Sequence, residues 1–107
     1  MAVEAAQLSD PVVRTVVTAM NNKDSDSFFS AFAPEAELTD DGTAHEFTTW
    51  AEREIFRGEG TLDVQSEGEG GLYLTGAFTS AQWGTFSTFW QFTVADGQVT
   101  RLDVGAL

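Results

Sequence analysis

The chain has 107 residues, no cysteine, and 17 acidic against 5 basic residues, which gives a formal net charge of −12. This length fits one domain, residues 1–107, whose core can be large enough to fold without disulfides. The absence of cysteine excludes disulfides and thiolate metal sites, and the scattered basic residues argue against nucleic acid and anionic membranes as partners.

The chain is expected to begin with a short tail and a helix. Residues 1–9 contain neither the basic nor the apolar region of a secretory signal, so we expect a tail on a cytoplasmic protein. Asp10 and Pro11 are typical of a helix start, because Asp caps orphan N–H groups and Pro fits the first helical position. Apolar residues then recur at helical spacing as far as Met20.

A second, shorter helix is expected to start at Asp24 or Ser25 and to end at Pro34. Its buried face is predicted to consist of Phe28, Phe29 and Phe32. Two amphipathic helices in tandem need a surface to cover, so a sheet is expected beyond them.

A pair of short strands is predicted next. Ala36–Asp40 and Thr43–Phe47 flank the dipeptide Asp41-Gly42, which is a turn signal. The sequence therefore predicts a small hairpin at this point.

A third helix and four strands are expected to complete the chain. Thr49 and Glu52 have the spacing of a capping box, so the helix is predicted from about Trp50 to Phe56. The four strands are predicted at Thr61–Glu67, Gly71–Ser80, Thr85–Ala95 and Gln98–Val104. Asp96 followed by glycine is a type I′ hairpin signal between the last two.

Residues Gly70–Ala95 contain no charged residue and carry Tyr73, two of the three Trp and four of the nine Phe. Polar residues and glycines interrupt this segment throughout, and its apolar residues are types that favour strands. The composition therefore predicts two strands of one sheet rather than a membrane span.

The last hairpin indicates that both faces of the sheet are covered. A two-residue loop at residues 96–97 pairs Val94 with Val99, Phe92 with Arg101, and Trp90 with Asp103. With this register neither face is purely polar, unlike a sheet that has one solvated face. We expect one face to meet the helices and the other to meet a partner subunit or a ligand.

The order of these elements resembles the nuclear transport factor 2-like superfamily, in its SnoaL-like (polyketide cyclase and ketosteroid isomerase) branch. The resembling segments cover nearly the whole chain: Val12–Asp26, Phe29–Asp41, Phe47–Phe56 and Phe89–Val104. The resemblance implies an α+β fold, a cone-shaped curved antiparallel sheet wrapped around three N-terminal helices, with a small apolar pocket. It also implies a homodimer formed through the outer sheet face.

The resemblance places Asp40 as a general base, because isomerase-like members carry an Asp at the end of the first short strand. A carboxylate beside apolar side chains is a better proton acceptor than one in water. The ligand pocket is expected to include Tyr73, Trp90, Phe92 and Asp103. The positions of the isomerase oxyanion donors are occupied by Val16 and Trp90, so steroid isomerisation is disfavoured.

Alternatives accompany each of these residues. Asp40 can equally be an ordinary turn residue. Asp40, Arg101 and Asp103 supply the residue types of an epoxide hydrolase site, although nothing in the sequence brings them together. His45 is more typical of a solvated side chain than of a proton-transfer group. No spacing predicts a metal site, and no cofactor is expected.

Two functions remain open. The first is a pocket protein that binds or transforms a small apolar molecule by Asp general acid/base chemistry. The second is a non-catalytic dimerisation or binding module with a vestigial pocket.

Overall fold

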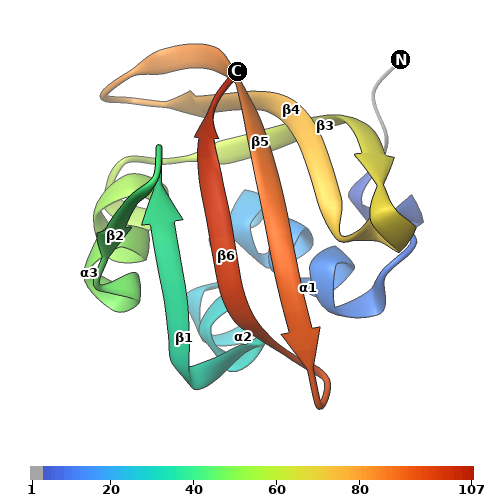
Figure 1. The fold of residues 1–107 in the computed structure, drawn as a ribbon. Helices are drawn as coiled ribbons and strands as arrows, with labels where there is room; N and C mark the ends of the chain where they lie inside the picture. Colours follow the sequence, from blue (N-terminus) through green and yellow to red (C-terminus); the bar gives the residue numbers. More distant parts are fainter. Residues whose placement is uncertain (1–3) are drawn as a thin grey trace.

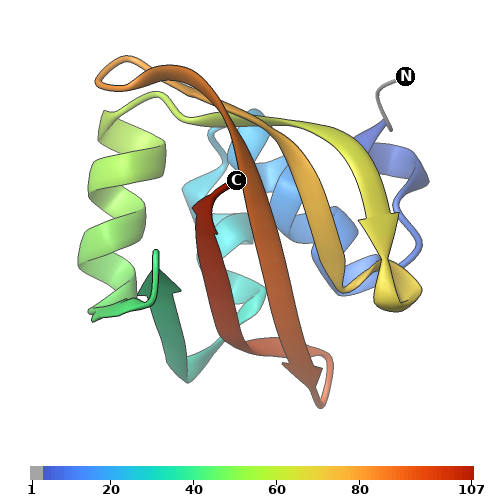
Figure 2. The same ribbon diagram turned by 45° about the horizontal axis from the view of Figure 1, so that its top comes forward.

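The computed structural model describes residues 4–107. One curved sheet carries the helices on its inner side (Figures 1 and 2). The elements in chain order are η1 (Ala5–Gln7), α1 (Pro11–Asn21), α2 (Ser25–Ser30), β1 (Phe32–Asp40), β2 (Thr43–His45), α3 (Phe47–Ala51), η2 (Glu52–Arg57), β3 (Thr61–Gly68), η3 (Glu69–Gly71), β4 (Tyr73–Ser80), β5 (Gly84–Ala95) and β6 (Gln98–Ala106).

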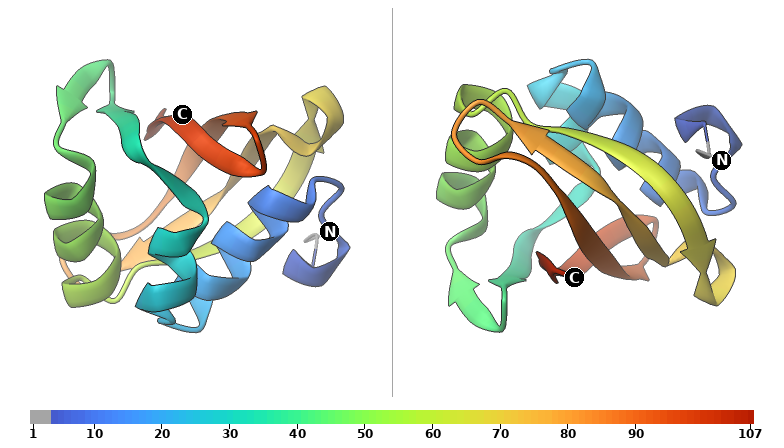
Figure 3. Two further views of the ribbon diagram at one scale, coloured as in Figure 1. Left: turned by 90° about the horizontal axis from the view of Figure 1, so that it is seen from below. Right: turned by 90° about the horizontal axis from the view of Figure 1, so that it is seen from above.

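The sheet has six strands in the order β2-β1-β6-β5-β4-β3. It is open, with β2 and β3 at its edges, and Figure 3 shows it curving around the helices as an α+β cone. The expected all-antiparallel sheet was wrong in one respect, because β1 and β6 pair in parallel. The chain leaves β2 through α3, enters the sheet at the opposite edge, and returns by hairpins until β6 lies beside β1.

The first helix forms as the sequence predicts. The Asp10 carboxylate accepts hydrogen bonds from the backbone N–H groups of Val12 and Val13, which caps α1. The apolar stripe of α1 is completely buried at Val13, Val16, Val17 and Met20. The expected tail was partly wrong, because Leu8 is buried in the core. Residues 1–3 of that tail lie outside the described residues.

The second helix is shorter than expected. Asp24 caps it through the Ser27 N–H, but the helix ends at Ser30, before Pro34. Pro34 lies within β1, in the stretch where the pairing of β1 with β6 shifts register. The missing N–H of Pro34 therefore falls where the hydrogen bonding between the two strands is irregular. The aromatic cluster beneath α2 joins residues far apart in the sequence: Phe28, Phe29, Phe32, Phe47 and Phe56.

The third helix starts earlier than the capping-box pattern predicts. Glu46, rather than Thr49, caps α3 by accepting from the N–H groups of Thr48 and Thr49. The Thr49 hydroxyl also donates to Glu46, and these hydrogen bonds lower the pKa of the Glu46 carboxyl. Phe47 therefore belongs to the helix and not to β2. The helix continues past Ala51 as the π-helical segment η2.

A bulge changes the register of the last hairpin. Val94 pairs with Val99 as expected, but the register shifts between Thr93 and Val94. Beyond the bulge, the pairs are Phe92 with Leu102 and Trp90 with Val104, instead of the expected partners Arg101 and Asp103.

The corrected register gives the two sheet faces different characters. The four inward side chains of those pairs are buried in the core. Gln91 pairs with Asp103 and Thr93 with Arg101 on the outer face, which is more polar than the sequence predicts. The stacked rings of Tyr73 and Phe89 are an aromatic feature of that face.

The charge-free segment is confirmed as two neighbouring strands, β4 and β5. Within residues 4–107, none of the helices has the length and apolar character needed to cross a bilayer.

Candidate functional site

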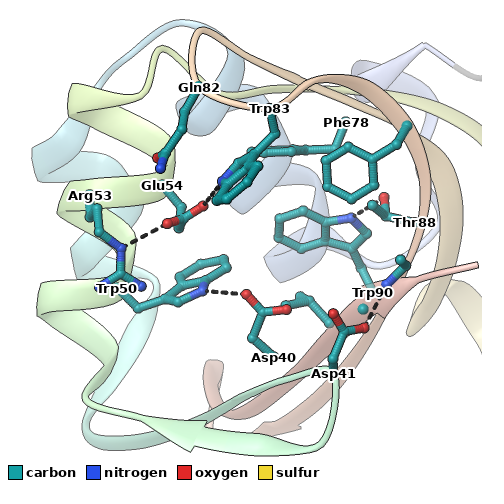
Figure 4. Close-up of a pocket in the computed structure, with 14 residues that line it drawn as sticks. Asp40, Asp41, Trp50, Arg53, Glu54, Phe78, Gln82, Trp83, Thr88 and Trp90 are labelled. Atoms are coloured by element: carbon teal, nitrogen blue, oxygen red, sulfur yellow. Dashed lines mark hydrogen bonds and ion pairs between the residues drawn. The ribbon is translucent and has the colours of Figure 1, made fainter.

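A cavity of about 640 Å³ lies between the third helix, the end of β1, the end of β6 and the β4–β5 hairpin (Figure 4). Its lining residues are Asp40, Asp41, Trp50, Arg53, Glu54, Phe78, Gln82, Trp83, Phe86, Thr88, Trp90, Val104, Gly105 and Ala106. The lining combines large aromatic side chains with carboxylates. This combination makes the cavity the candidate site.

All three Trp of the chain line this cavity. Trp50 comes from α3 and Trp90 from β5, and their rings meet edge to face with centroids 6.3 Å apart. Trp83 lies in the turn between β4 and β5 and is 60% exposed. The cavity therefore has a rigid aromatic interior and one solvent-exposed indole at its mouth.

Asp40 is the last residue of β1, and its carboxylate points toward the cavity (Figure 4). Its Oδ2 accepts a hydrogen bond of 2.9 Å from the Trp50 indole N–H. Its Oδ1 accepts none from any residue that the structure describes. One oxygen is thus fixed by the protein while the other remains available to a ligand.

The neighbouring Asp41 closes the end of the sheet. Its Oδ1 accepts a 2.9 Å hydrogen bond from the Ala106 N–H, which joins the β1–β2 turn to β6. Asp41 and Gly42 both have positive φ, as the predicted turn requires. This turn places two adjacent carboxylates beside the cavity.

The indole of Trp90 is already hydrogen-bonded within the protein. Its N–H donates to the Thr88 hydroxyl at 2.9 Å, and that hydroxyl donates to the Gly76 carbonyl at 2.9 Å. Trp90, at one of the expected oxyanion-donor positions, therefore has no free N–H to donate to an oxyanion. Val16, at the other donor position, is fully buried in the core.

A second carboxylate network lies at the mouth of the cavity. Glu54 accepts from the Trp83 indole N–H at 3.2 Å and pairs with Arg53 at 2.7 Å. These contacts hold the β4–β5 turn against the third helix. Glu54 and its partners thus shape the entrance to the cavity.

Of the five site residues expected from the sequence, Asp40 and Trp90 line the cavity. The other three do not line it. Phe92 is 1% exposed and packs in the core beyond the cavity. Tyr73 faces outward and stacks on Phe89, because inward positions of β4 are taken by Leu74, Gly76 and Phe78. Asp103 is turned to the outer face by the bulge.

Asp103 belongs to a polar cluster on the outer face. It accepts from Thr39 and Arg101, and Arg101 also pairs with Glu37 at 2.8 Å. Burial opposes ionisation of Asp103, but the hydrogen bonds from Arg101 and Thr39 and the charge of Arg101 outweigh it and lower its pKa. Asp40 faces the opposite side of the sheet, so the set Asp40, Arg101 and Asp103 does not converge.

The sequence missed several residues that form the site. Trp50 is buried in the core, and nothing in the sequence links its N–H to Asp40. No sequence pattern marks Glu54 or Thr88 as a site residue. Their roles depend on hydrogen bonds from Trp83 and Trp90, respectively, that form only in the folded chain. Within the described residues, no three His, Cys, Asp or Glu side chains gather where they could hold a metal ion.

This combination of a curved sheet, enclosed helices and a cavity at the open end is the nuclear transport factor 2-like fold, which confirms the expected architecture. The sequence itself matches no protein-family model and no curated protein. The fold is similar to that of a proposed polyketide cyclase from Sinorhizobium meliloti, with a TM-score of 0.77 and 18% identity over 95% of this chain and 99% of the other.

Two further solved structures have the same fold. One is a nuclear transport factor 2-like protein of unknown function from Cytophaga hutchinsonii, with a TM-score of 0.75, 14% identity, and 87% and 84% coverage of the two chains. The other is an epoxide hydrolase from M. tuberculosis, with a TM-score of 0.70, 19% identity, and 90% and 80% coverage.

Proposed function

We propose that this protein is a SnoaL-like pocket protein that binds a small hydrophobic molecule and uses Asp40 as a general base. One observation carries the proposal. The Asp40 carboxylate is fixed by Trp50 through one oxygen, and its other oxygen faces a cavity walled by aromatic side chains. A base must lie within hydrogen-bonding reach of the proton that it removes, and this arrangement provides such a position.

The surroundings of Asp40 suit proton transfer. A positioned base contributes about 10²–10⁴-fold to a reaction rate, provided that its orientation is fixed before the substrate arrives. The Trp50 hydrogen bond supplies that orientation. The structural neighbours include proposed cyclases and isomerases, which supports this class of chemistry by analogy of fold.

The cavity also limits the reaction. The indole N–H groups of Trp50, Trp83 and Trp90 are all bonded to protein acceptors. None of these three indoles is therefore free to stabilise a substrate oxyanion, which is usually the largest catalytic contribution. Steroid isomerisation and epoxide hydrolysis are accordingly not part of the proposal.

Elimination of 5-nitrobenzisoxazole tests the proposal without knowledge of the natural substrate. A base removes the ring C–H proton, the N–O bond breaks, and a coloured cyanophenolate forms. We expect the protein to accelerate this reaction and Asp40→Asn, which retains an acceptor for Trp50, to lower the rate about 10²-fold or more. Asp63→Asn removes an exposed carboxylate of β3 and should leave the rate unchanged. Equal rates in the protein and in Asp40→Asn would refute the role of Asp40.

A second candidate function is a dimerisation module, which the outer face supports. Tyr73 and Phe89 stack there with ring centroids 6.2 Å apart and an interplanar angle of 10°. We propose that this stack lies at the centre of a homodimer interface. Sedimentation across a dilution series should detect a dimer that Tyr73→Ser with Phe89→Ser dissociates, whereas a monomer at every concentration would contradict it.

A further inference from the structure

We infer that the ligand of this cavity is an organic cation, an amine or quaternary ammonium group attached to an apolar body. The inference rests on the proposed function, because it names the class of molecule that the Asp40 cavity takes. It follows from the free oxygen of Asp40, the charge of the lining and its exposed indole, which together favour a cation over a neutral or anionic ligand.

The indole and hydroxyl donors deep in the cavity are already occupied, whereas one carboxylate oxygen there is free of hydrogen bonds from residues 4–107. The N–H groups of Trp50 and Trp90 donate to Asp40 and Thr88, and the Thr88 hydroxyl donates to the Gly76 carbonyl. Asp40 Oδ1 accepts no bond from the described residues. A ligand that reaches Asp40 Oδ1 finds an acceptor and therefore has to bring a donor or a positive charge to that point.

The charge of the lining also favours a cationic ligand. Three acidic side chains, Asp40, Asp41 and Glu54, line the cavity against one basic side chain, Arg53. Arg53 is already paired with Glu54 at 2.7 Å. The two aspartates have no Lys or Arg partner within 4.0 Å among the described residues. A cation is thus attracted both by the cavity and by a chain of net charge −12.

The aromatic walls provide the remaining complementarity. A cation over the face of an indole is attracted by the ring quadrupole, and Trp is the strongest such partner. Trp50 and Trp90 are 3% and 2% exposed, so they form the closed inner end of the cavity. Trp83 adds an exposed indole at the mouth. The exposed indole of Trp83, together with carboxylates that lack a Lys or Arg partner within residues 4–107, suits an organic cation.

The test compares three probes of similar shape: phenyltrimethylammonium, its neutral isostere tert-butylbenzene, and the anion benzenesulfonate. Because all three Trp of the chain line the cavity, quenching of tryptophan fluorescence reports binding at this site directly. We expect the cation to bind at least tenfold more tightly than the neutral isostere, and the anion not to bind.

Two variants separate the cavity from the general negative charge of the chain. Asp40→Asn should reduce the preference for the cation about tenfold, whereas Asp63→Asn removes the same charge from exposed β3 and should change it less than twofold. Trp83→Leu keeps an apolar side chain but loses the ring face. This substitution should weaken binding of the cation severalfold and leave binding of the neutral isostere unchanged. Because residue 83 is exposed, the substitution should disturb folding little.

The outcomes distinguish this inference from the proposed function. If tert-butylbenzene binds as tightly as the cation while 5-nitrobenzisoxazole is eliminated in an Asp40-dependent way, the cation inference is overturned and the general base stands. If the cation is preferred but elimination does not depend on Asp40, the cavity binds cations and the general base fails. Equal loss of cation preference in Asp40→Asn and Asp63→Asn would also overturn the inference, because the preference would then come from the net charge of the protein and not from the cavity.

Discussion

The indole N–H of Trp50 donates a 2.9 Å hydrogen bond to Oδ2 of Asp40, which ties the third helix to the end of β1. Trp50 is 3% exposed, so its N–H has no bulk water as an alternative partner. The contact both anchors the helix and fixes the carboxylate. Structure and proposed chemistry therefore depend on the same bond.

Trp50→Phe removes this bond while it keeps most of the buried ring. We expect the free energy of unfolding to fall by about 1.5–3 kcal/mol, the usual contribution of a hydrogen bond to a charged group. Urea denaturation measures the change. In an Asp40→Ala background the same substitution should lower the free energy of unfolding by clearly less, because the acceptor is already absent. An equal loss in both backgrounds would show that the hydrogen bond contributes nothing to stability.

Thr88→Val tests the hydrogen bonds behind Trp90. Valine has the shape of threonine but cannot accept from the Trp90 indole N–H, which is left buried without a partner. We expect a loss of about 1–3 kcal/mol in thermal or chemical unfolding. Thr88→Ser keeps the hydroxyl and should restore most of the hydrogen-bonding contribution. Equal stability of the Val variant and the wild type would contradict this role of Thr88.

Local signals in the sequence predicted most elements of the fold, because each depends on neighbouring residues. Asp10 before Pro11 marked the start of α1, and Asp96 before glycine marked the last turn. The start of α3 was missed because its cap is Glu46, a residue type that is less common at this position than Ser, Thr, Asp or Asn.

The site was less predictable than the fold. The bulge at Thr93 turned Asp103 outward, and no residue pattern specifies the position of such a bulge. Asp40 came from the resemblance to a family, whereas its partner Trp50 depends on how a helix packs against a strand end. Trp83 lies in a turn, and only the folded chain brings it to Glu54.

Asn21 connects the end of α1 to edge strand β3. Its side chain donates to the Leu62 carbonyl at 2.9 Å and accepts from the Leu62 N–H at 2.8 Å, as a neighbouring strand would. We expect Asn21→Ala to lower the free energy of unfolding by about 1–3 kcal/mol, since two hydrogen bonds are lost. The adjacent Asn22 is exposed, so Asn22→Ala is the matched control. Similar losses in both variants would contradict a specific role for Asn21.

The outer-face cluster predicts a dependence of stability on pH. Arg101 and Thr39 lower the pKa of Asp103 below its ordinary value of 3.8. A carboxyl with a lowered folded-state pKa stabilises the protein above the unfolded value, and this contribution is lost as the pH falls through the folded-state value. Asp103→Asn should therefore reduce the melting temperature at pH 7, by the few degrees typical of a partly screened ion pair.

The difference in melting temperature between Asp103→Asn and the wild type should shrink as the pH is lowered below 3.8. At low pH the Asp103 carboxyl becomes protonated in both the folded and the unfolded wild-type protein. Differential scanning calorimetry at several pH values measures it. Asp63→Asn, which removes an exposed carboxylate, supplies the control. If the melting temperature of Asp103→Asn instead fell further below that of the wild type as the pH decreased, the lowered pKa of Asp103 would be contradicted.

The most direct test of the central claim is a heteronuclear correlation spectrum of the nitrogen-labelled protein during titration with phenyltrimethylammonium. The three indole N–H groups, from Trp50, Trp83 and Trp90, each give a separate signal from the cavity. We predict that these three signals shift together and saturate with one affinity, while the amides of Tyr73 and Thr93 on the outer face stay in place. Shifts confined to the outer face, with the indole signals unmoved, would contradict the cavity as the binding site.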